Sequence, residues 1–425
     1  MSHPTAPGQL DPSFANQGRF SHEEYDHLGP IAVVSSSQQI LITSAPRREL
    51  EITILRLNPD GSLDQNFGAK GISKVTYEGA LRVFLTAITV DESQRIFLLG
   101  DYNVGPDQYH PFVLRLHADG RPDTGFGEHG RPYRVYNMID GRSPRPTPAA
   151  TDINSRKTGL ASNAPQQAHI EGDTLYFSSR DHIVAINLNG ELQLRFNQTG
   201  YWKARHSEQE GLLGGLAPSN GKLIAAVAPL PTDDYQDHTY VLRLDQDGNV
   251  DTGFAENGYL RITTKGHTLL PKQLKASASG AHFTLLCATD INFVNEGTAL
   301  ASFTSAGQLN NQFNDGLPLI LNKPEGHMAS PTGLGIWQLP EKEEKLYLSL
   351  DYLDEEDRAY FKTVRLNANG TADNTYGEDG WATLPGPAGL ASELACQHDG
   401  KLLVAANIRL PEDPKNGLYV VRLLA

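Results

Sequence analysis

Seven copies of one unit constrain the fold of this chain more than any other feature. The unit joins a V-x-R-L strand, a turn ending in Gly and the sequence L-D-x-x-F-G, most plainly in residues 52–71, 112–130, 240–258 and 363–380. Weaker copies occupy residues 183–200 and 299–316. The aromatic residue after the turn recurs at Phe14, Phe67, Phe126, Phe196, Phe254, Phe313 and Tyr376. Such periodicity predicts stacked repeats, because a single unit cannot bury both of its faces.

Each unit predicts four short strands, which we call A to D from the centre of a ring outward. Alternating apolar runs such as residues 94–100 and 222–228 predict strand B, and the V-x-R-L run predicts strand C. Gly in the turn between C and D permits a positive φ. We expect the Asp after this turn to cap backbone N–H groups, and the aromatic ring to be buried against a neighbouring blade.

The two ends of the chain indicate that the repeats close into a ring. The chain ends in a C strand at residues 419–423 and begins, at residues 8–14, with the turn and the D-strand portion of the same unit. The sequence therefore predicts an all-β, seven-bladed β-propeller that forms a single domain over residues 1–425. Residues 1–20 complete the last blade, and residues 137–169 form a long insertion between blades.

The pattern V-x-R-L-x-x-D-G-x-L-D-x-x-F-G-x-x-G resembles the delta-60 repeat of bacterial proteins, a family associated with β-propellers. The resemblance covers almost the whole chain and is strongest in the four clearest copies. It implies a propeller fold and an association with export or the cell surface. It implies no chemistry, because propellers carry many unrelated functions.

Charge and hydropathy exclude several classes of partner. The formal net charge of -14 argues against nucleic acid, which requires a basic surface. The longest apolar runs are strand-sized, so we expect no membrane insertion. The N-terminal residues form no secretion signal, which favours a cytoplasmic protein or export by a non-classical route. We expect a monomer, with Cys287 and Cys396 as buried thiols.

The connections between strands point to one face of the ring. Strand direction alternates within a blade, so A–B and C–D turns lie at one end, and B–C and D–A connections lie at the other. The first class is short, whereas the second is long, acidic and aromatic, as in residues 101–112 and 231–240. We expect a ligand there, on loops outside the blade cores. The candidate ligand-binding residues are Tyr102, Asp107, Tyr109, Trp202, His206, Asp234, Tyr235, Asp351 and Tyr352.

Metal and cofactor sites are not predicted. The D–A connections carry His22, His27, His206, His267 and His327 around the expected channel mouth, but at irregular spacing and without an HxH or HExxH motif. Residues 245–256 superficially resemble a calcium loop, yet the repeat already explains them as a turn and its cap. We assign no catalytic residue.

Two functions remain open. The first is a non-catalytic binding or scaffold propeller that engages a protein or glycan through the B–C and D–A face. The alternative is an enzyme, a hydrolase or lyase acting on a carbohydrate or small ester at the channel mouth. The absence of a catalytic motif favours the first, and metal analysis of the purified protein would distinguish them.

Overall fold

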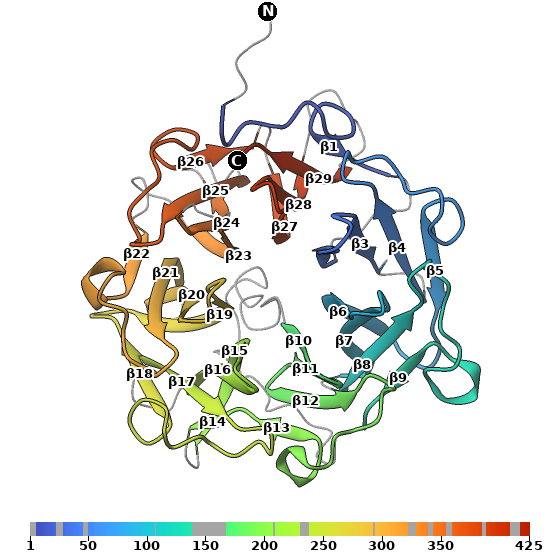
Figure 1. The fold of residues 1–425 in the computed structure, drawn as a ribbon, viewed down its shortest axis with the longest axis horizontal. Coiled ribbons are helices and arrows are strands. Elements are labelled where there is room, and N and C mark those ends of the chain that lie inside the picture. Colours follow the sequence, from blue (N-terminus) through green and yellow to red (C-terminus); the bar gives the residue numbers. More distant parts are fainter. Residues whose placement is uncertain are drawn as a thin grey trace, which may run out of the picture.

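The computed structural model is a ring of seven β-sheets around a common axis (Figure 1). It describes residues 6–22, 29–45, 50–106, 108–137, 167–206, 209–229, 238–291, 294–321, 329–338, 343–353, 359–384, 388–408 and 417–425. The protein is thus a seven-bladed β-propeller, as the repeats predict. Three single-turn 3-10 helices, Glu128–Gly130, Phe196–Gln198 and Asn314–Gly316, lie in the described part of the chain.

The strands follow the chain order within blades 1 to 6, and blade 7 takes its outer strand from the start of the chain. Blade 1 contains β2 (Ile31–Val33), β3 (Ile40–Ser44), β4 (Glu51–Leu57) and β5 (Ile72–Thr76); blade 2 contains β6 (Arg82–Val90), β7 (Ile96–Gly105), β8 (Gln108–Leu116) and β9 (Tyr133–Val135); blade 3 contains β10 (Ala168–Glu171), β11 (Thr174–Ser179), β12 (His182–Asn187) and β13 (Tyr201–Lys203). Blade 4 contains β14 (Arg205–His206), β15 (Gln209–Ser219), β16 (Lys222–Pro229), β17 (His238–Leu244) and β18 (Tyr259–Thr263); blade 5 contains β19 (Thr268–Ala276), β20 (His282–Ile291), β21 (Val294–Thr304) and β22 (Leu319–Leu321). Blade 6 contains β23 (Ala329–Trp337), β24 (Lys345–Leu353), β25 (Ala359–Asn367) and β26 (Trp381–Thr383); blade 7 contains β27 (Ala388–Cys396), β28 (Leu402–Ile408), β29 (Gly417–Leu423) and β1 (Arg19–Phe20).

Blade 7 confirms that the two ends of the chain close the ring. Strand β1 pairs antiparallel with β29, with Arg19 opposite Val421 and Phe20 opposite Val420. Leu10 forms a further bridge to Leu423. The N-terminal segment therefore supplies the outer strand of a sheet whose other three strands come from the C-terminal end (Figure 1).

The predicted insertion at residues 137–169 ends earlier than expected. Residues 168 and 169 already belong to β10, the innermost strand of blade 3. Gln167 directly before it is buried. Residues 138–166 lie outside the described part of the chain.

The repeated aromatic residues are the contacts between neighbouring blades. All seven are almost completely buried: Phe14, Phe67, Phe126, Phe196, Phe254, Phe313 and Tyr376. The turn glycine of the next blade approaches the ring closely. At Gly120, φ is +84° and an added Cβ would lie 2.6 Å from the Phe67 ring. Glycine is therefore required there both by its backbone conformation and by the close approach.

A backbone hydrogen bond accompanies most of these contacts. The residue after the aromatic donates its N–H to a turn carbonyl of the next blade, a contact that we call the junction bond. It occurs from Ala15 to Asp60, Gly68 to Asp119, Asn197 to Asp247, Ala255 to Ala306, Asn314 to Asn369 and Gly377 to Pro7, at 2.7–3.0 Å. Only the junction between blades 2 and 3 lacks it among the described residues.

The arginine of V-x-R-L links strand C, the turn and the next blade. Arg56 Nε donates to Asp64 Oδ2 at 2.8 Å, and its guanidinium lies 4.5 Å from the centroid of Phe67. Asp64 Oδ1 accepts the backbone N–H of Asn66 at 3.0 Å, so the predicted cap is present. The same ion pair joins Arg115 to Asp123, Arg243 to Asp251, Arg365 to Asp373 and Arg422 to Asp11.

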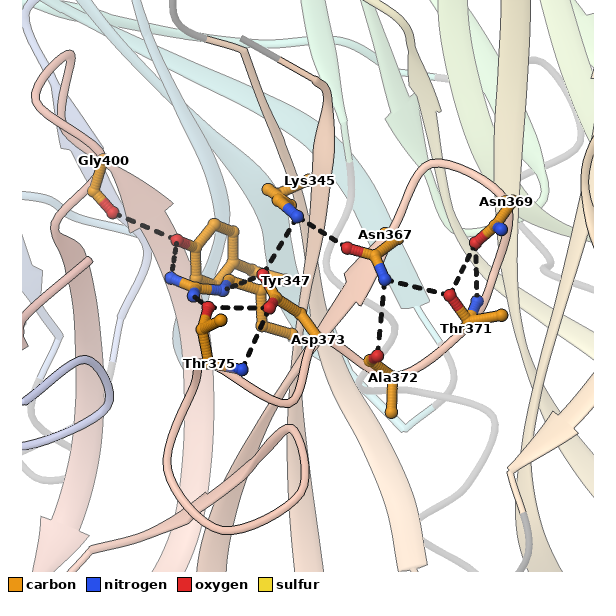
Figure 2. A network of polar contacts seen from close by, with 10 residues as sticks. Lys345, Tyr347, Asn367, Asn369, Thr371, Ala372, Asp373, Thr375 and Gly400 are labelled. Carbon is orange, nitrogen blue, oxygen red and sulfur yellow. Dashed lines mark hydrogen bonds and ion pairs between the residues drawn. The ribbon is translucent and has the colours of Figure 1, made fainter.

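Blade 6 shows the network around this aspartate in full (Figure 2). Asp373 accepts hydrogen bonds from Thr375 and lies 3.0 Å from the ammonium group of Lys345. The hydroxyl of Tyr347 donates to the carbonyl of Gly400 in blade 7 at 3.3 Å. The polar groups of the repeat thus hold one blade together and reach the next.

Blades 3 and 5 lack both charges of this ion pair. Ala185 and Ser302 occupy the arginine position, and Gln193 and Asn310 occupy the aspartate position, as their equivalent backbone hydrogen bonds show. In blade 5, Asn310 Nδ2 donates instead to Ser302 Oγ at 3.2 Å. These are the two weaker copies of the repeat in the sequence.

Candidate functional site

The B–C connections are built differently from the expected loops. Most of residues 101–112 belong to the hairpin of β7 and β8, which pair as far as Gly105 and Gln108. Residues 291–297 likewise lie largely in β20 and β21. In these two blades the backbone pairing of the B and C strands therefore continues through most of the segment that was expected to be a loop, and strands position a residue more precisely than a loop does.

Two of the predicted ligand-binding residues are buried in the structure. Trp202 lies in strand β13 and is 2% exposed, so its expected place in a loop outside the blade core is wrong. It packs with Phe196 and Leu242 between blades 3 and 4. Tyr102 lies in β7, is 6% exposed and stacks on Phe112 at a centroid distance of 6.0 Å. Trp202 is buried between two half-buried neighbours of a short strand, whereas Tyr102 belongs to a strand that is buried along almost its whole length.

Tyr109 contacts the next blade across the predicted face. The guanidinium of Arg180, in the B–C turn of blade 3, lies 4.1 Å from the centroid of the Tyr109 ring. Phe84 approaches the same ring at 6.1 Å. Beneath them, Ser179 donates a hydrogen bond to Asp101 at 2.6 Å, which fixes the two blades to each other.

His206 lies in a cluster of aromatic rings within blade 4, on strands β14, β17 and β18. Its imidazole stacks on Tyr240 at 3.6 Å with an interplanar angle of 4°, and Tyr259 meets it edge-on at 4.8 Å. His238 contacts Tyr240 at 4.9 Å, and Arg261 Nη2 lies 3.2 Å from His238 Nδ1. We call these five residues the aromatic–histidine cluster. Burial, and then the nearby His238, lower the pKa of His206, so the ring is neutral near pH 7.

The B–C turn of blade 3 lies between Tyr109 of blade 2 and the aromatic–histidine cluster of blade 4 in the order of the ring. The B–C turn that carries Arg180 continues to Asp181, whose carbonyl accepts the backbone N–H of Ala204 at 2.6 Å, close to His206. Tyr109, Arg180, His206, His238, Tyr240 and Tyr259 are all half-buried. Partly exposed rings held on strands in this way provide a preorganised surface for a ligand.

Of the remaining predicted residues, Asp351 lies in a different part of the ring. Asp351 lies in β24 of blade 6, which is separated from blades 2 to 4 by blade 5 on one side and by blades 7 and 1 on the other (Figure 1). Tyr352 is on the same strand. Asp107, Asp234 and Tyr235 lie outside the described residues. Sequence reasoning missed Arg180, Tyr240 and Tyr259, which it treated as turn or strand residues.

Side chains at the centre of the ring bond to the inner edges of neighbouring sheets. His169 Nε2 donates to Leu216 O of the next blade at 2.7 Å, and Gln273 Oε1 accepts from Leu334 N at 2.6 Å. Glu393 accepts from the backbone N–H of Ile31 at 3.1 Å. Gln167 bonds to two inner strands, accepting from Leu216 and Leu274. Because an open sheet edge presents unpaired backbone groups, these side chains have a structural explanation.

Burial shifts the pKa of three ionisable residues on the innermost strands, which are His169, Lys272 and Glu393. It lowers the pKa of His169 to about 4 and that of Lys272 to about 8. It raises the pKa of Glu393 to about 7, although Lys275 nearby acts in the opposite direction. Lys272 lies at a bulge of β19, between Pro271 and Gln273.

These three shifts act on stability in different directions. Native Glu393 retains its proton above the ordinary value of 4.5, so its contribution to the free energy of unfolding falls as pH rises from 4.5 to about 7. The lowered pKa of His169 contributes in the opposite direction between about 4 and 6.5, so the Glu393 contribution must be isolated by substitution. Native Lys272 loses its proton at a lower pH than an unfolded lysine, so its contribution to stability rises between about 8 and 10.5. Urea titrations at several pH values should show that Glu393→Gln, which retains an oxygen for Ile31, reduces the first change by on the order of 1 kcal/mol. An unaltered pH profile in this variant would contradict the assignment.

The histidines of the D–A connections do not converge in the described part of the chain. His22 stacks on Phe20 in blade 7, His206 lies in blade 4, and His267 precedes β19. His27 and His327 are outside the described residues. Within those residues, no three His, Cys, Asp or Glu side chains gather as metal ligands. No helix in the same part of the chain is long and apolar enough to cross a membrane.

Asp245, at the start of the calcium-like segment, caps a turn. Its Oδ1 accepts the backbone N–H groups of Asp247 and Asn249, each at 2.9 Å. Asp251 binds Arg243 and Lys222 at 2.7 Å and 2.6 Å. The carboxylates of Asp245 and Asp251 therefore already have partners within the repeat.

Fold and repeat together define a propeller-repeat protein. Residues 49–67, 95–126 and 219–254 match the family model described as "Domain of unknown function (DUF5122) beta-propeller". These three stretches lie in blades 1, 2 and 4, where the Arg–Asp pair is present. The sequence matches none of the curated proteins.

Several solved structures are similar in fold at low sequence identity. Drosophila Semaphorin 2a is 9% identical, with a TM-score of 0.49, and the match covers 99% of this chain and 76% of that one. A polysaccharide lyase described as an ulvan lyase is 9% identical, with a TM-score of 0.44 and coverage of 98% and 96%. A protein from Lactobacillus plantarum is 13% identical, with a TM-score of 0.46 and coverage of 91% and 99%. These likenesses concern the fold alone.

Proposed function

We propose that the protein is a non-catalytic binding propeller that engages a protein or glycan through the face carrying its B–C and D–A connections. The observation that supports this proposal is the half-buried aromatic–histidine cluster, continued by Tyr109 and Arg180. Its rings offer flat faces and polar edges to a partner, and its backbone is held by sheet hydrogen bonds. Little ordering is therefore needed on binding.

The alternative, an enzyme acting at the channel mouth, has less support. His169 and Glu393 are the ionisable groups of the innermost strands that are best placed for acid–base chemistry, but each bonds to the inner edge of a neighbouring sheet. A general base also needs access to its substrate. The binding proposal requires no change in these contacts.

The proposal predicts that His206→Ala and Tyr109→Ala each weaken partner binding at least about tenfold, as for aromatic contact residues at an interface. Glycan arrays and pull-down with the full chain would identify the partner, and titration calorimetry would measure the loss. Leu194→Ala is the matched control, because Leu194 is 63% exposed but lies beside the outer turn of blade 3.

Retention of wild-type affinity by both variants would contradict this face as the binding surface. Trp202→Ala does not serve as a test, because its ring is buried between blades. We expect that variant to lose about 3–5 kcal/mol of stability.

A further inference from the structure

The junction between blades 2 and 3 is built differently from the other six. Here the N–H of Gly127 donates to Arg131 O within its own loop, at 2.9 Å, and not to the turn of blade 3. Side chains span the junction instead: the Tyr136 hydroxyl donates to Gly190 O at 2.9 Å, and Arg134 packs against Gly190. The outer part of this junction is therefore held by side chains and not by backbone.

A cavity of about 380 Å³ lies at this junction. It is on the end of the ring that carries the C–D turns, opposite the face of the proposed function. We call it the seam cavity, and it is lined by Glu128, His129, Arg131, Tyr133, Arg134, Val135, Tyr136, Gly190, Glu191 and Leu192. Its volume is in the range of small-ligand sites.

The two arginines of the seam cavity retain capacity for an anion. Arg134 Nε donates to Phe126 O at 2.8 Å, which orients the guanidinium, and no acidic residue in the described ranges pairs with it. Arg131 pairs with Glu78 at 3.3 Å, and both side chains are largely exposed. Its guanidinium also lies 5.9 Å from the centroid of the Tyr133 ring. An ion pair of that kind is weak and exchanges readily.

A second cavity, of about 250 Å³ between blades 1 and 2, provides a contrast. Its arginine, Arg56, is held by Asp64 at 2.8 Å and also donates to Ala118 O. The Arg56 guanidinium is therefore already bonded within the repeat and to the next blade. The seam cavity differs because Arg134 belongs to strand β9 and lies outside the repeated ion pair.

We propose that the seam cavity is a binding site for a small, ring-bearing monocarboxylate. Arg134 and Arg131 take the carboxylate, for which guanidinium groups are the preferred donors. Tyr133, Tyr136 and Leu192 contact the ring. Glu191 and Glu128 at the rim balance the two arginines, so a ligand with a single negative charge is favoured over a polyanion.

Titration calorimetry of the full chain with benzoate, glucuronate and inorganic phosphate tests this site. We expect one of the two ring carboxylates to bind with a Kd of about 1 mM or tighter, and phosphate to bind more weakly. Arg134→Gln should weaken binding at least about tenfold, and Arg131→Gln less. Arg195→Gln should leave it unchanged, because that exposed arginine pairs with Asp247 at the intact junction between blades 3 and 4.

Three results would overturn the proposal. They are failure of both carboxylates to bind at about 10 mM, equal loss in the Arg195 and Arg134 variants, and tighter binding of phosphate than of either carboxylate. Thermal melts of each variant establish that the ring is intact, and Arg131→Gln, at an exposed position, keeps the test valid if Arg134→Gln unfolds. His206→Ala should bind the carboxylates normally, so failure of this site is separable from failure of the binding face.

Discussion

Removal of residues 1–20 is expected to destabilise the protein by more than about 5 kcal/mol and to lower its Tm by more than about 10 °C. The deletion exposes the site of Phe14, which is fully buried, and removes strand β1 from blade 7. It also removes Asp11, which pairs with Arg422 at 2.9 Å. A buried guanidinium would be left without its carboxylate, and an inner strand of blade 7 would become an open edge.

Differential scanning calorimetry of the shortened and complete chains would measure this loss. Deletion of residues 1–5 is the control, because every contact named between the two ends of the chain involves residue 7 or a later residue. If the chain lacking residues 1–20 melted at the same temperature as the complete one, the pairing of the two chain ends would not be what holds the ring closed.

Asp64→Ala is expected to cost about 3–5 kcal/mol, the range for removing one partner of a buried ion pair. From the sequence, Asp64 is only a turn cap, for which about 1 kcal/mol would be expected. In the structure it also accepts from Arg56 and from Gln39, at 2.8 Å each, and its side chain is only 7% exposed. The substitution therefore leaves the buried charge of Arg56 without its partner and also removes the cap of the turn.

A double-mutant cycle with Arg56→Leu would isolate the pair, using chemical denaturation to measure each free energy of unfolding. The double variant should be less destabilised than the sum of the single ones. Asp60→Ala in the same blade is the matched control, since its exposed carboxylate caps only Ser62. Equal effects of the Asp64 and Asp60 substitutions would contradict a role beyond capping.

The architecture was predictable because the same unit recurs seven times in the sequence. The chain begins with the last part of a unit and ends with its earlier part, and this alone predicts the pairing of β1 with β29. The Arg–Asp pair was missed, although a signal was present: Arg56 and Asp64 are separated by eight residues, and Arg115 and Asp123 by the same number. An arginine in a strand pattern is easily taken for a surface residue.

The candidate site was less predictable, because its contacts join different blades. Tyr109 and Arg180 meet across a junction, and no local pattern specifies that approach. Trp202 was assigned to a loop because strand β13 has only three residues and follows a polar segment. Which face of a three-residue strand is buried depends on the neighbouring blade, and periodicity over so few residues does not reveal it.

Blades 3 and 5 differ from the other five blades at the same two positions. Ala185 and Ser302 replace the arginine, and Gln193 and Asn310 replace the aspartate. In all seven blades the two charges are therefore either both present or both absent. A buried charge without its partner is costly, whereas a neutral pair of residues is tolerated. The seven blades of one chain thus act as internal comparisons of which residue combinations this position accepts.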